Sequence, residues 1–94
     1  MAGRLRILVN LLGAEVRLKQ EVSLDLPSPG LKDVLRALKD GLGAPLGKFL
    51  KDDLSPAEGC AVLLNGRNIG SLGAGGQEVR DGDEITFTVL VAGG

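Results

Sequence analysis

The sequence VRDGDEITFTVLVAGG, residues 79–94, places a turn, a strand and a glycine pair in direct succession. Its DGD segment, residues 81–83, is typical of a turn, because aspartate side chains hydrogen-bond to nearby backbone and glycine accepts a positive φ. Apolar side chains then alternate with polar ones, which indicates a strand with one buried face. The stretch therefore predicts a closing strand that runs directly into Gly93 and Gly94. The alternating apolar positions are Ile85, Phe87, Val89 and Val91.

Residues 4–26 predict two strands of a hairpin. Over residues 4–11, apolar side chains alternate with arginine and asparagine, and a second alternation over residues 16–26 indicates the return strand. Leu8 departs from the first pattern. It would point to the polar side, where an apolar residue is either incidental or part of a contact surface. The alternating apolar positions are Leu5, Ile7, Val9 and Leu11, then Val16, Leu18, Val22, Leu24 and Leu26.

The segment that follows predicts one main helix. Ser28 before Pro29 is typical of an N-cap followed by proline at the first helical position. Gly41 and Gly43 indicate where the helix ends. Between them, apolar residues recur with the spacing of one helix face, which would cover the sheet. These residues are Leu31, Val34, Leu35 and Leu38.

Residues 43–59 are weakly patterned and predict a semi-ordered connection with a short helical turn. Residues 60–64 form an apolar run that indicates a strand, and Asn65-Gly66 is the dipeptide preferred in a two-residue type I′ hairpin turn. The element order predicts an α+β protein of the β-grasp kind, with a mixed sheet covered on one face by one main helix. We expect the last strand to return to the middle of the sheet, and residues 1–94 to form a single domain with a flexible tail over about residues 91–94.

The composition excludes several classes of function. A chain of 94 residues has room for one hydrophobic core. With a net charge of −1, two Phe and no Trp or Tyr, it has neither the basic stripe nor the stacking aromatics of a nucleic-acid platform. With no His and a single Cys, Cys60, it predicts no internal disulfide and no metal site. No membrane-spanning segment or secretory signal is indicated, which favours a cytoplasmic protein.

The terminal glycine pair is the best indication of chemistry. Two residues without a Cβ pass through a narrow channel and adopt backbone angles that other residues avoid, so they suit a terminus that enters another protein's active site. The reactive group would be the α-carboxylate of Gly94. Chance is the competing interpretation, since the chain contains 15 Gly, and Gly75-Gly76 is an internal pair without a free carboxylate.

In order and in detail, these segments resemble the ubiquitin-like bacterial sulfur carriers, which are the molybdopterin synthase small subunit MoaD and the thiamine-pathway carrier ThiS. The likeness covers the first strand, the helix and the strand with its Asn65-Gly66 turn, and it is most specific over residues 79–85 and the final Gly93-Gly94. The length and the extended helix-to-strand connection favour the MoaD side. The approach to the glycine pair, residues 89–92, lacks the proline common in MoaD.

The resemblance implies a sulfur carrier that is modified and consumed, not an enzyme with catalytic side chains of its own. A partner adenylyltransferase similar to MoeB or ThiF, using ATP and Mg that it binds itself, would join the carboxylate of Gly94 to AMP. A sulfur donor would then leave a thiocarboxylate. The acceptor would be a large molybdopterin synthase subunit similar to MoaE, or alternatively thiazole synthase.

Two other classes of function stay open at this point: a protein modifier that forms isopeptides with lysines, and a β-grasp interaction module without terminal chemistry. Asp81 and Asp83 are interpreted as turn residues rather than as a catalytic pair. Cys60, at the start of an apolar strand, is interpreted as a buried structural residue rather than as a sulfur-relay thiol. The chain itself is expected to bind no cofactor and no metal.

Partner binding must offset the entropy of ordering the tail, which is roughly 4–8 kcal/mol for about four residues. Glycines offer no side chains for this. We therefore expect an apolar docking patch made of Leu8 and Leu63 on the outer face of the sheet, together with Leu90, Val91 and Ala92 beside the glycine pair.

Overall fold

The computed structural model describes residues 4–13, 17–25, 30–69 and 78–89. Five strands occur in these ranges: β1 (Arg4–Leu12), β2 (Arg17–Asp25), β3 (Cys60–Leu64), β4 (Arg67–Asn68) and β5 (Glu84–Val89). They form one sheet in the order β2-β1-β5-β3-β4. The β1 and β5 strands run parallel, and the other neighbours are antiparallel. The last strand thus returns to the centre, as the sequence predicted.

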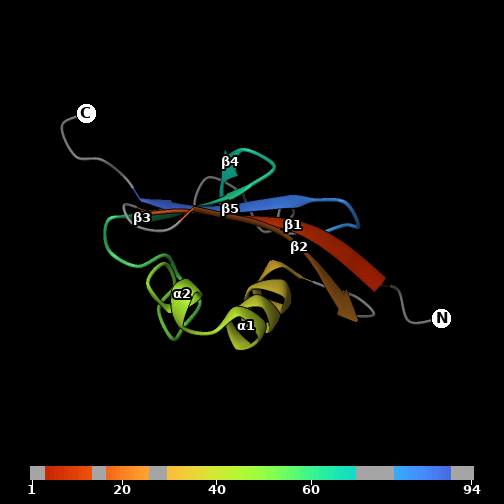
Figure 1. The fold of residues 1–94 in the computed structure, drawn as a ribbon, viewed down its shortest axis with the longest axis horizontal. Helices are drawn as coiled ribbons and strands as arrows, with labels where there is room; N and C mark the ends of the chain where they lie inside the picture. The colour runs from red at the N-terminus through yellow and green to blue at the C-terminus, as the bar shows by residue number, and fades with distance from the viewer. Residues whose placement is uncertain (1–3, 14–16, 26–29, 70–77, 90–94) are drawn as a thin grey trace.

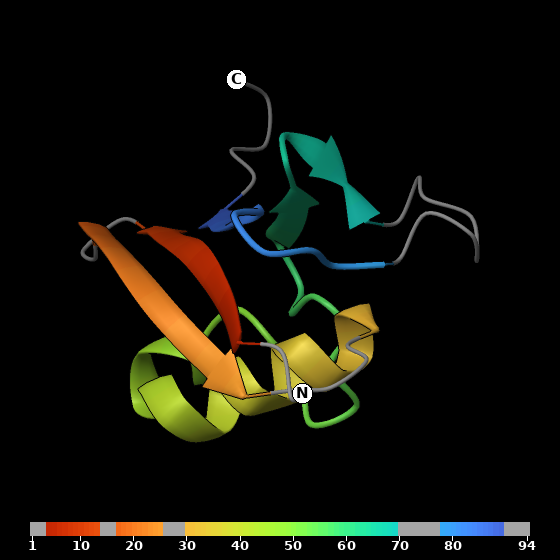
Figure 2. The same cartoon turned by 90° about the vertical axis from the view of Figure 1, so that its right-hand side faces the viewer.

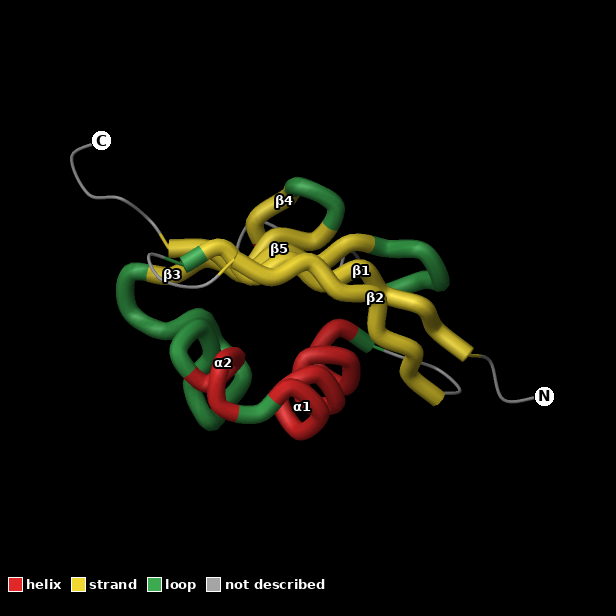
Figure 3. Tube along the Cα trace, in the orientation of Figure 1, coloured by secondary structure: helices red, strands yellow, loops and turns green. Residues whose placement is uncertain are grey.

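Both helices lie on the same face of the sheet, α1 (Leu31–Leu42) and the short α2 (Ala44–Gly47) (Figure 1). Figure 3 shows the same two layers by element type, with the helices on one side of the strands. In the view turned by 90°, β1 and β2 extend together across α1 (Figure 2). A mixed sheet with one main helix on one face is the β-grasp fold, so the predicted fold class is confirmed.

The core lies between the sheet and the helices, where the inward positions of the strands meet one face of α1. The Phe87 ring on β5 packs against Phe49 with a centroid distance of 6.3 Å. Because the chain has no other aromatic residue, aliphatic side chains fill the rest of this layer. The fully buried positions include Ile7, Val9, Leu11, Val34, Leu38, Leu46, Val62 and Ile85.

The start of α1 differs from the prediction. Its N-cap is Gly30 in an extended conformation, so the expectation of an N-cap at Ser28 is wrong, and Ser28 and Pro29 lie outside the described residues. Asp33 explains the later start, because its carboxylate accepts a hydrogen bond from the Gly30 N–H at 3.3 Å. Of the two predicted end signals, Gly43 is confirmed, because it has φ 68° and donates its N–H to the Lys39 carbonyl, whereas Gly41 lies inside α1.

The connection after α1 packs against the core through its described side chains. The prediction of a semi-ordered connection is therefore wrong. Its predicted helical turn is present as α2, and Leu46, Phe49 and Leu50 are buried against the core. Leu54 is also buried, although it adopts φ 69°, a conformation that costs a non-glycine residue about 1 kcal/mol or more. Burial of the leucine side chain offsets this cost.

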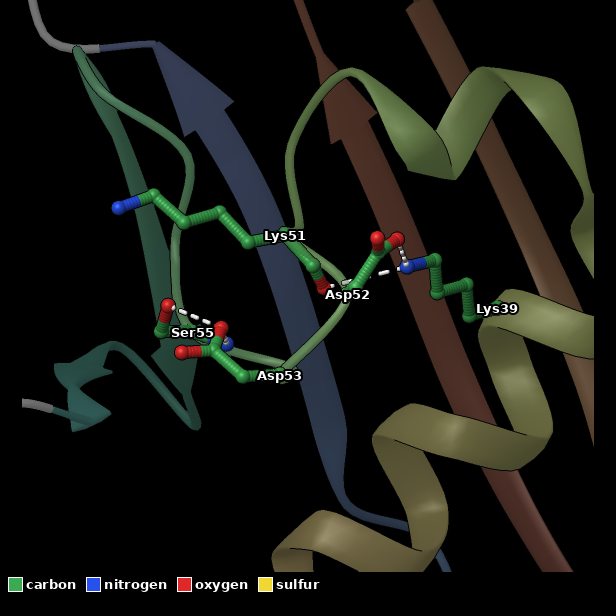
Figure 4. Close-up of polar contacts among 5 residues, drawn as sticks. All are labelled: Lys39, Lys51, Asp52, Asp53 and Ser55. Carbon is green, nitrogen blue, oxygen red and sulfur yellow. Dashed lines mark hydrogen bonds and ion pairs between the residues drawn. The ribbon is translucent and has the colours of Figure 1, made fainter.

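Charged side chains hold the loop around Leu54 against α1 (Figure 4). The Lys39 ammonium donates to the Lys51 carbonyl at 3.1 Å and pairs with Asp52 at 3.2 Å. On the other side of the loop, Asp53 accepts hydrogen bonds from the Ser55 hydroxyl at 2.6 Å and from the Ser55 N–H at 3.1 Å. These contacts satisfy the polar groups of a loop that must turn sharply.

The hydrogen bond from the Ser55 hydroxyl lowers the pKa of Asp53 below its ordinary value, with a further contribution from the Ser55 N–H. Stability from this carboxylate is present above its ordinary pKa and is lost as the pH falls through the lowered value.

In the Ser55→Ala variant we expect the pKa of Asp53 to rise, as measured by NMR titration of its carboxyl carbon. The Ser23→Ala variant, which removes a hydroxyl from β2, is the control. An unchanged Asp53 titration in Ser55→Ala contradicts this assignment.

Both predicted turns are confirmed, and both connect to the central strands. Asn65 and Gly66 have φ 52° and 84°, as a type I′ turn requires, and the Asn65 side chain accepts the Glu84 N–H at 2.9 Å. In the 81–83 turn, Gly82 has φ 89° and donates to the Arg6 carbonyl at 2.8 Å. The Asp81 carboxylate accepts the Arg6 N–H at 2.7 Å. The Asp83 carboxylate accepts the Arg80 N–H at 2.8 Å. Asp81 and Asp83 therefore fix the start of β5, as their role as turn residues predicted.

Candidate functional site

The base of the C-terminal tail is held at the centre of the sheet. β5 is hydrogen-bonded to β1 on one side and to β3 on the other, and its last described residue, Val89, pairs with Cys60. The five residues that follow, which were predicted to carry the reaction and part of the docking patch, lie outside the described residues: Leu90, Val91, Ala92, Gly93 and Gly94. The structure therefore describes the candidate site up to Val89, where the tail begins.

Two predicted docking residues lie on the outer face, the face opposite the helices. Leu8 on β1 pairs with Glu84, and Leu63 on β3 pairs with Thr86. Both leucines are half-buried, although they belong to the strand positions that point away from the core. Since β5 lies between β1 and β3, the two leucines flank the central strand.

A polar cluster separates the two leucines. The Asn10 amide donates to the Glu84 carboxylate at 2.8 Å and to the Thr86 hydroxyl at 3.1 Å. Where the sequence predicted an apolar docking patch, the described part of the outer face has a hydrogen-bonded polar centre between the two leucines. Such a surface suits a partner with apolar groups at its rim and polar groups opposite the cluster.

One further apolar residue near the tail was missed by the sequence interpretation. Leu12, at the end of β1, is 43% exposed. It pairs with Thr88, whose hydroxyl donates to the Leu12 carbonyl at 3.4 Å. The signal was present, because Leu12 continues the outward phase of Leu8, but the strand was taken to end one residue earlier. Leu12 lies closer along the strands to the start of the tail than Leu8 does.

Cys60 is half-buried rather than fully buried as expected. It occupies the inward phase of β3, packs against the core, and its thiol lies 3.6 Å from the Lys48 carbonyl. Its place at the start of β3, where the strand is only partly covered, accounts for the remaining exposure. The interpretation of Cys60 as a structural residue is compatible with these contacts.

The rest of the described chain has few features of a side-chain reaction centre. In the described ranges no polar or charged residue is buried, and no group of three or more His, Cys, Asp or Glu is arranged to hold a metal ion. The longest helix of the described part, α1, has 12 residues and is too short to cross a bilayer.

The fold and the central tail-bearing strand define a ubiquitin-like β-grasp protein. The sequence model of the ThiS family matches residues 9–94, nearly the whole chain. The chain therefore belongs to the ThiS family, and it is a ubiquitin-like protein of the sulfur-carrier and modifier class. A comparison with curated proteins gave no match.

Solved structures with the same fold include two archaeal modifiers. SAMP1 from Haloferax volcanii is 28% identical, with a TM-score of 0.63 and coverage of 98% of this chain and 100% of that one. Small archaeal modifier protein 1 from Methanosarcina acetivorans is 27% identical, with a TM-score of 0.60 and coverage of 98% and 99%. Urm1 from Trypanosoma brucei, at 22% identity, a TM-score of 0.61 and 100% coverage of both chains, supports the fold alone.

Proposed function

We propose that this protein carries sulfur as a thiocarboxylate on the α-carboxyl group of Gly94. The observation that supports this most is that the ThiS-family match extends through residue 94 and thus includes the glycine pair. The position of β5 adds a physical reason. A strand paired on both sides holds the base of the tail, while the glycines leave the terminus narrow enough to enter a partner's active site.

The chemistry requires activation, because a carboxylate is a poor electrophile until one oxygen becomes part of a leaving group. The Gly94 carboxylate attacks the α-phosphorus of ATP and releases pyrophosphate, which gives an acyl-adenylate. A hydrosulfide then attacks the acyl carbon and expels AMP, which leaves the thiocarboxylate. A persulfide donor delivers the same sulfur through an acyl disulfide that a thiol reduces.

In this proposal the catalytic groups belong to the partners. A cytoplasmic adenylyltransferase similar to MoeB or ThiF binds the ATP and Mg, and Gly93 allows the terminus to reach its nucleotide. The protein contributes the tail and a docking surface, which we assign to Leu8 and Leu63 with Leu90, Val91 and Ala92. Leu12, exposed at the end of β1 beside β5, is added to this surface.

For the acceptor we propose the large subunit of a molybdopterin synthase, similar to MoaE. The length of the chain and the ordered connection between α1 and β3, which places Leu46, Phe49 and Leu50 in the core, support this over thiazole synthase. Thiazole synthase of the thiamine pathway is the alternative acceptor. Purification of the chain with its bound partners distinguishes the two.

A second candidate function is that of a protein modifier. It is favoured by the likeness to two structures of small archaeal modifier protein 1, at 27% and 28% identity. The same Gly94 adenylate would then be attacked by a lysine amine, which forms an isopeptide and releases AMP. Ladders of larger adducts on immunoblots of cell extracts would support conjugation, and their absence during active cofactor synthesis would favour the carrier.

The test of the carrier proposal is intact-mass analysis of the protein isolated from its native cells. We expect a fraction of the protein to carry the mass increase that accompanies replacement of one oxygen by sulfur. Fragmentation should place this increase on Gly94. Protein that contains only oxygen under conditions of active cofactor synthesis, or a chain that continues beyond residue 94 without processing, would contradict the proposal.

A further inference from the structure

β2 is a long strand at the edge of the sheet. It has 9 residues, pairs with β1 on one side, and within the described part of the chain no strand pairs with its other side. Residues 17–21 of this strand are all exposed. An exposed edge of this length presents a row of backbone donors and acceptors to another strand. The opposite edge, β4, has only two residues.

The hydrogen-bond pattern of β1 shows which groups of β2 face outward. The Leu8 N–H donates to Asp83 and the Arg6 carbonyl accepts from Gly82, so the even residues of β1 point toward β5. The odd residues, including Val9, therefore point toward β2, where Val9 pairs with Gln20. Since the backbone groups of successive residues alternate in direction, those of Lys19 and Glu21 point away from the sheet.

Lys19 and Glu21 also carry opposite charges on the same face of this edge. Both are exposed, and in the described ranges neither takes part in an ion pair or a side-chain hydrogen bond. They stand on either side of Gln20. A second copy of the strand, placed antiparallel with its Gln20 opposite this one, therefore has Glu21 opposite Lys19 and Lys19 opposite Glu21.

We propose that two copies of this chain associate through antiparallel pairing of their β2 strands around Gln20. In this register Lys19 of each copy lies opposite Glu21 of the other, and the pair shares the outward backbone hydrogen bonds. On the helix side, Leu18, which is 37% exposed, lies opposite Val22 of the other copy. Charge, backbone and apolar contacts thus all agree in one register.

The neighbouring register that keeps the same backbone bonds is less favourable. Pairing around Glu21 would place the two Glu21 carboxylates directly opposite each other, and like charges in that position are destabilising. The charge pattern therefore disfavours pairing around Glu21. It also selects a second copy over an arbitrary strand, because the complementarity lies within one sequence.

The paired sheet keeps the described ends of the two β5 strands away from the pairing edge. A twofold axis through the Gln20 pair makes the two β5 strands run in opposite directions, so their C-terminal ends lie at opposite ends of the shared sheet. Each β5 is also separated from the pairing edge by β1. The association is therefore independent of the chemistry proposed for Gly94, and either inference can fail without the other.

Sedimentation equilibrium of the full chain over micromolar to millimolar concentrations tests the association. We expect a reversible dimer for the unmodified chain. The Lys19→Glu and Glu21→Lys variants each place like charges opposite each other twice, and each should raise the dimer Kd by about tenfold or more. An equimolar mixture of the two variants should restore the dimer, because opposite charges then meet across the interface.

The control is Lys32→Glu, which makes the same charge change at an exposed position of α1 and should leave the Kd unchanged. Thermal melts confirm that each variant is folded, as expected for exposed positions. A chain that stays monomeric at millimolar concentration overturns the proposal. So does a dimer that is indifferent to both charge reversals, or a mixture of the two variants that fails to associate.

Discussion

Deletion of Gly94 is expected to abolish AMP transfer to this protein and to leave its thermal unfolding unchanged. The truncated chain still ends in a carboxylate, on Gly93, but that carboxylate stops about 3.5 Å short of the position that the full tail reaches. A misplacement of only about 1 Å in an active site can cost about 10²-fold in rate, so we expect at least that loss. ATP–pyrophosphate exchange catalysed by the partner adenylyltransferase measures it.

The stability side of this prediction follows from the core, because in the described part of the chain every core residue lies before residue 88. The Gly94→Ala variant adds one methyl group at the terminus and should also impair AMP transfer. Its matched control is Gly41→Ala in α1, where an added Cβ has no neighbour within 4 Å. That control should transfer AMP normally and gain roughly 0.5–1 kcal/mol of stability. Equal AMP transfer to the truncated and complete chains would refute the role of Gly94.

The Leu35→Asp variant is expected not to fold. Leu35 is 1% exposed and lies on the face of α1 that covers the sheet. Removing a buried leucine side chain costs about 2–5 kcal/mol, and a carboxylate placed there has no buried polar partner and adds several kcal/mol more. A domain of this size has a total stability of about 5–14 kcal/mol. The sum of the two costs is of that order, so the folded state is lost.

Circular dichroism during urea titration measures this outcome, and we expect no cooperative transition for Leu35→Asp. The control is Arg36→Asp, which introduces the same residue at the next position of α1, where the side chain is exposed. That variant should unfold cooperatively with a midpoint near that of the unmodified chain. A cooperative Leu35→Asp transition near the same midpoint would mean that α1 does not carry the core in solution.

The outer face of the sheet carries polar groups between its leucines, whereas the sequence predicted an apolar docking patch there. Leu8 and Leu63 lie there, but the Asn10 amide joins Glu84 and Thr86 between them. A partner that binds this face must match a polar centre, since burying these groups without hydrogen bonds is costly. Leu12 extends the apolar part toward the end of β5.

Regular patterns in the sequence predicted most of the fold. The alternation in residues 4–11 and 85–89, the one-sided apolar face of α1 and the Asn65-Gly66 turn each depend on neighbours along the chain. Such local signals fix the element types because the side-chain period follows directly from backbone geometry. The start of α1 was misplaced because Asp33, three residues inside the helix, caps Gly30 and outweighs the Ser-Pro signal. The connection around Leu54 was underestimated because its order comes from core burial, not from any local pattern.

By itself, the sequence determined the order of the elements, the strand that leads to Gly93 and Gly94, and most of the residues that build the core. Only the tertiary structure decided which residues become neighbours. It placed the polar cluster between Leu8 and Leu63, exposed Leu12, and left β2, with Lys19 and Glu21, at an edge that no described strand covers. The physical reason is that these features depend on pairing between strands distant in sequence. Periodicity tells which side of a strand is buried, whereas the register of the sheet decides which side chains become neighbours.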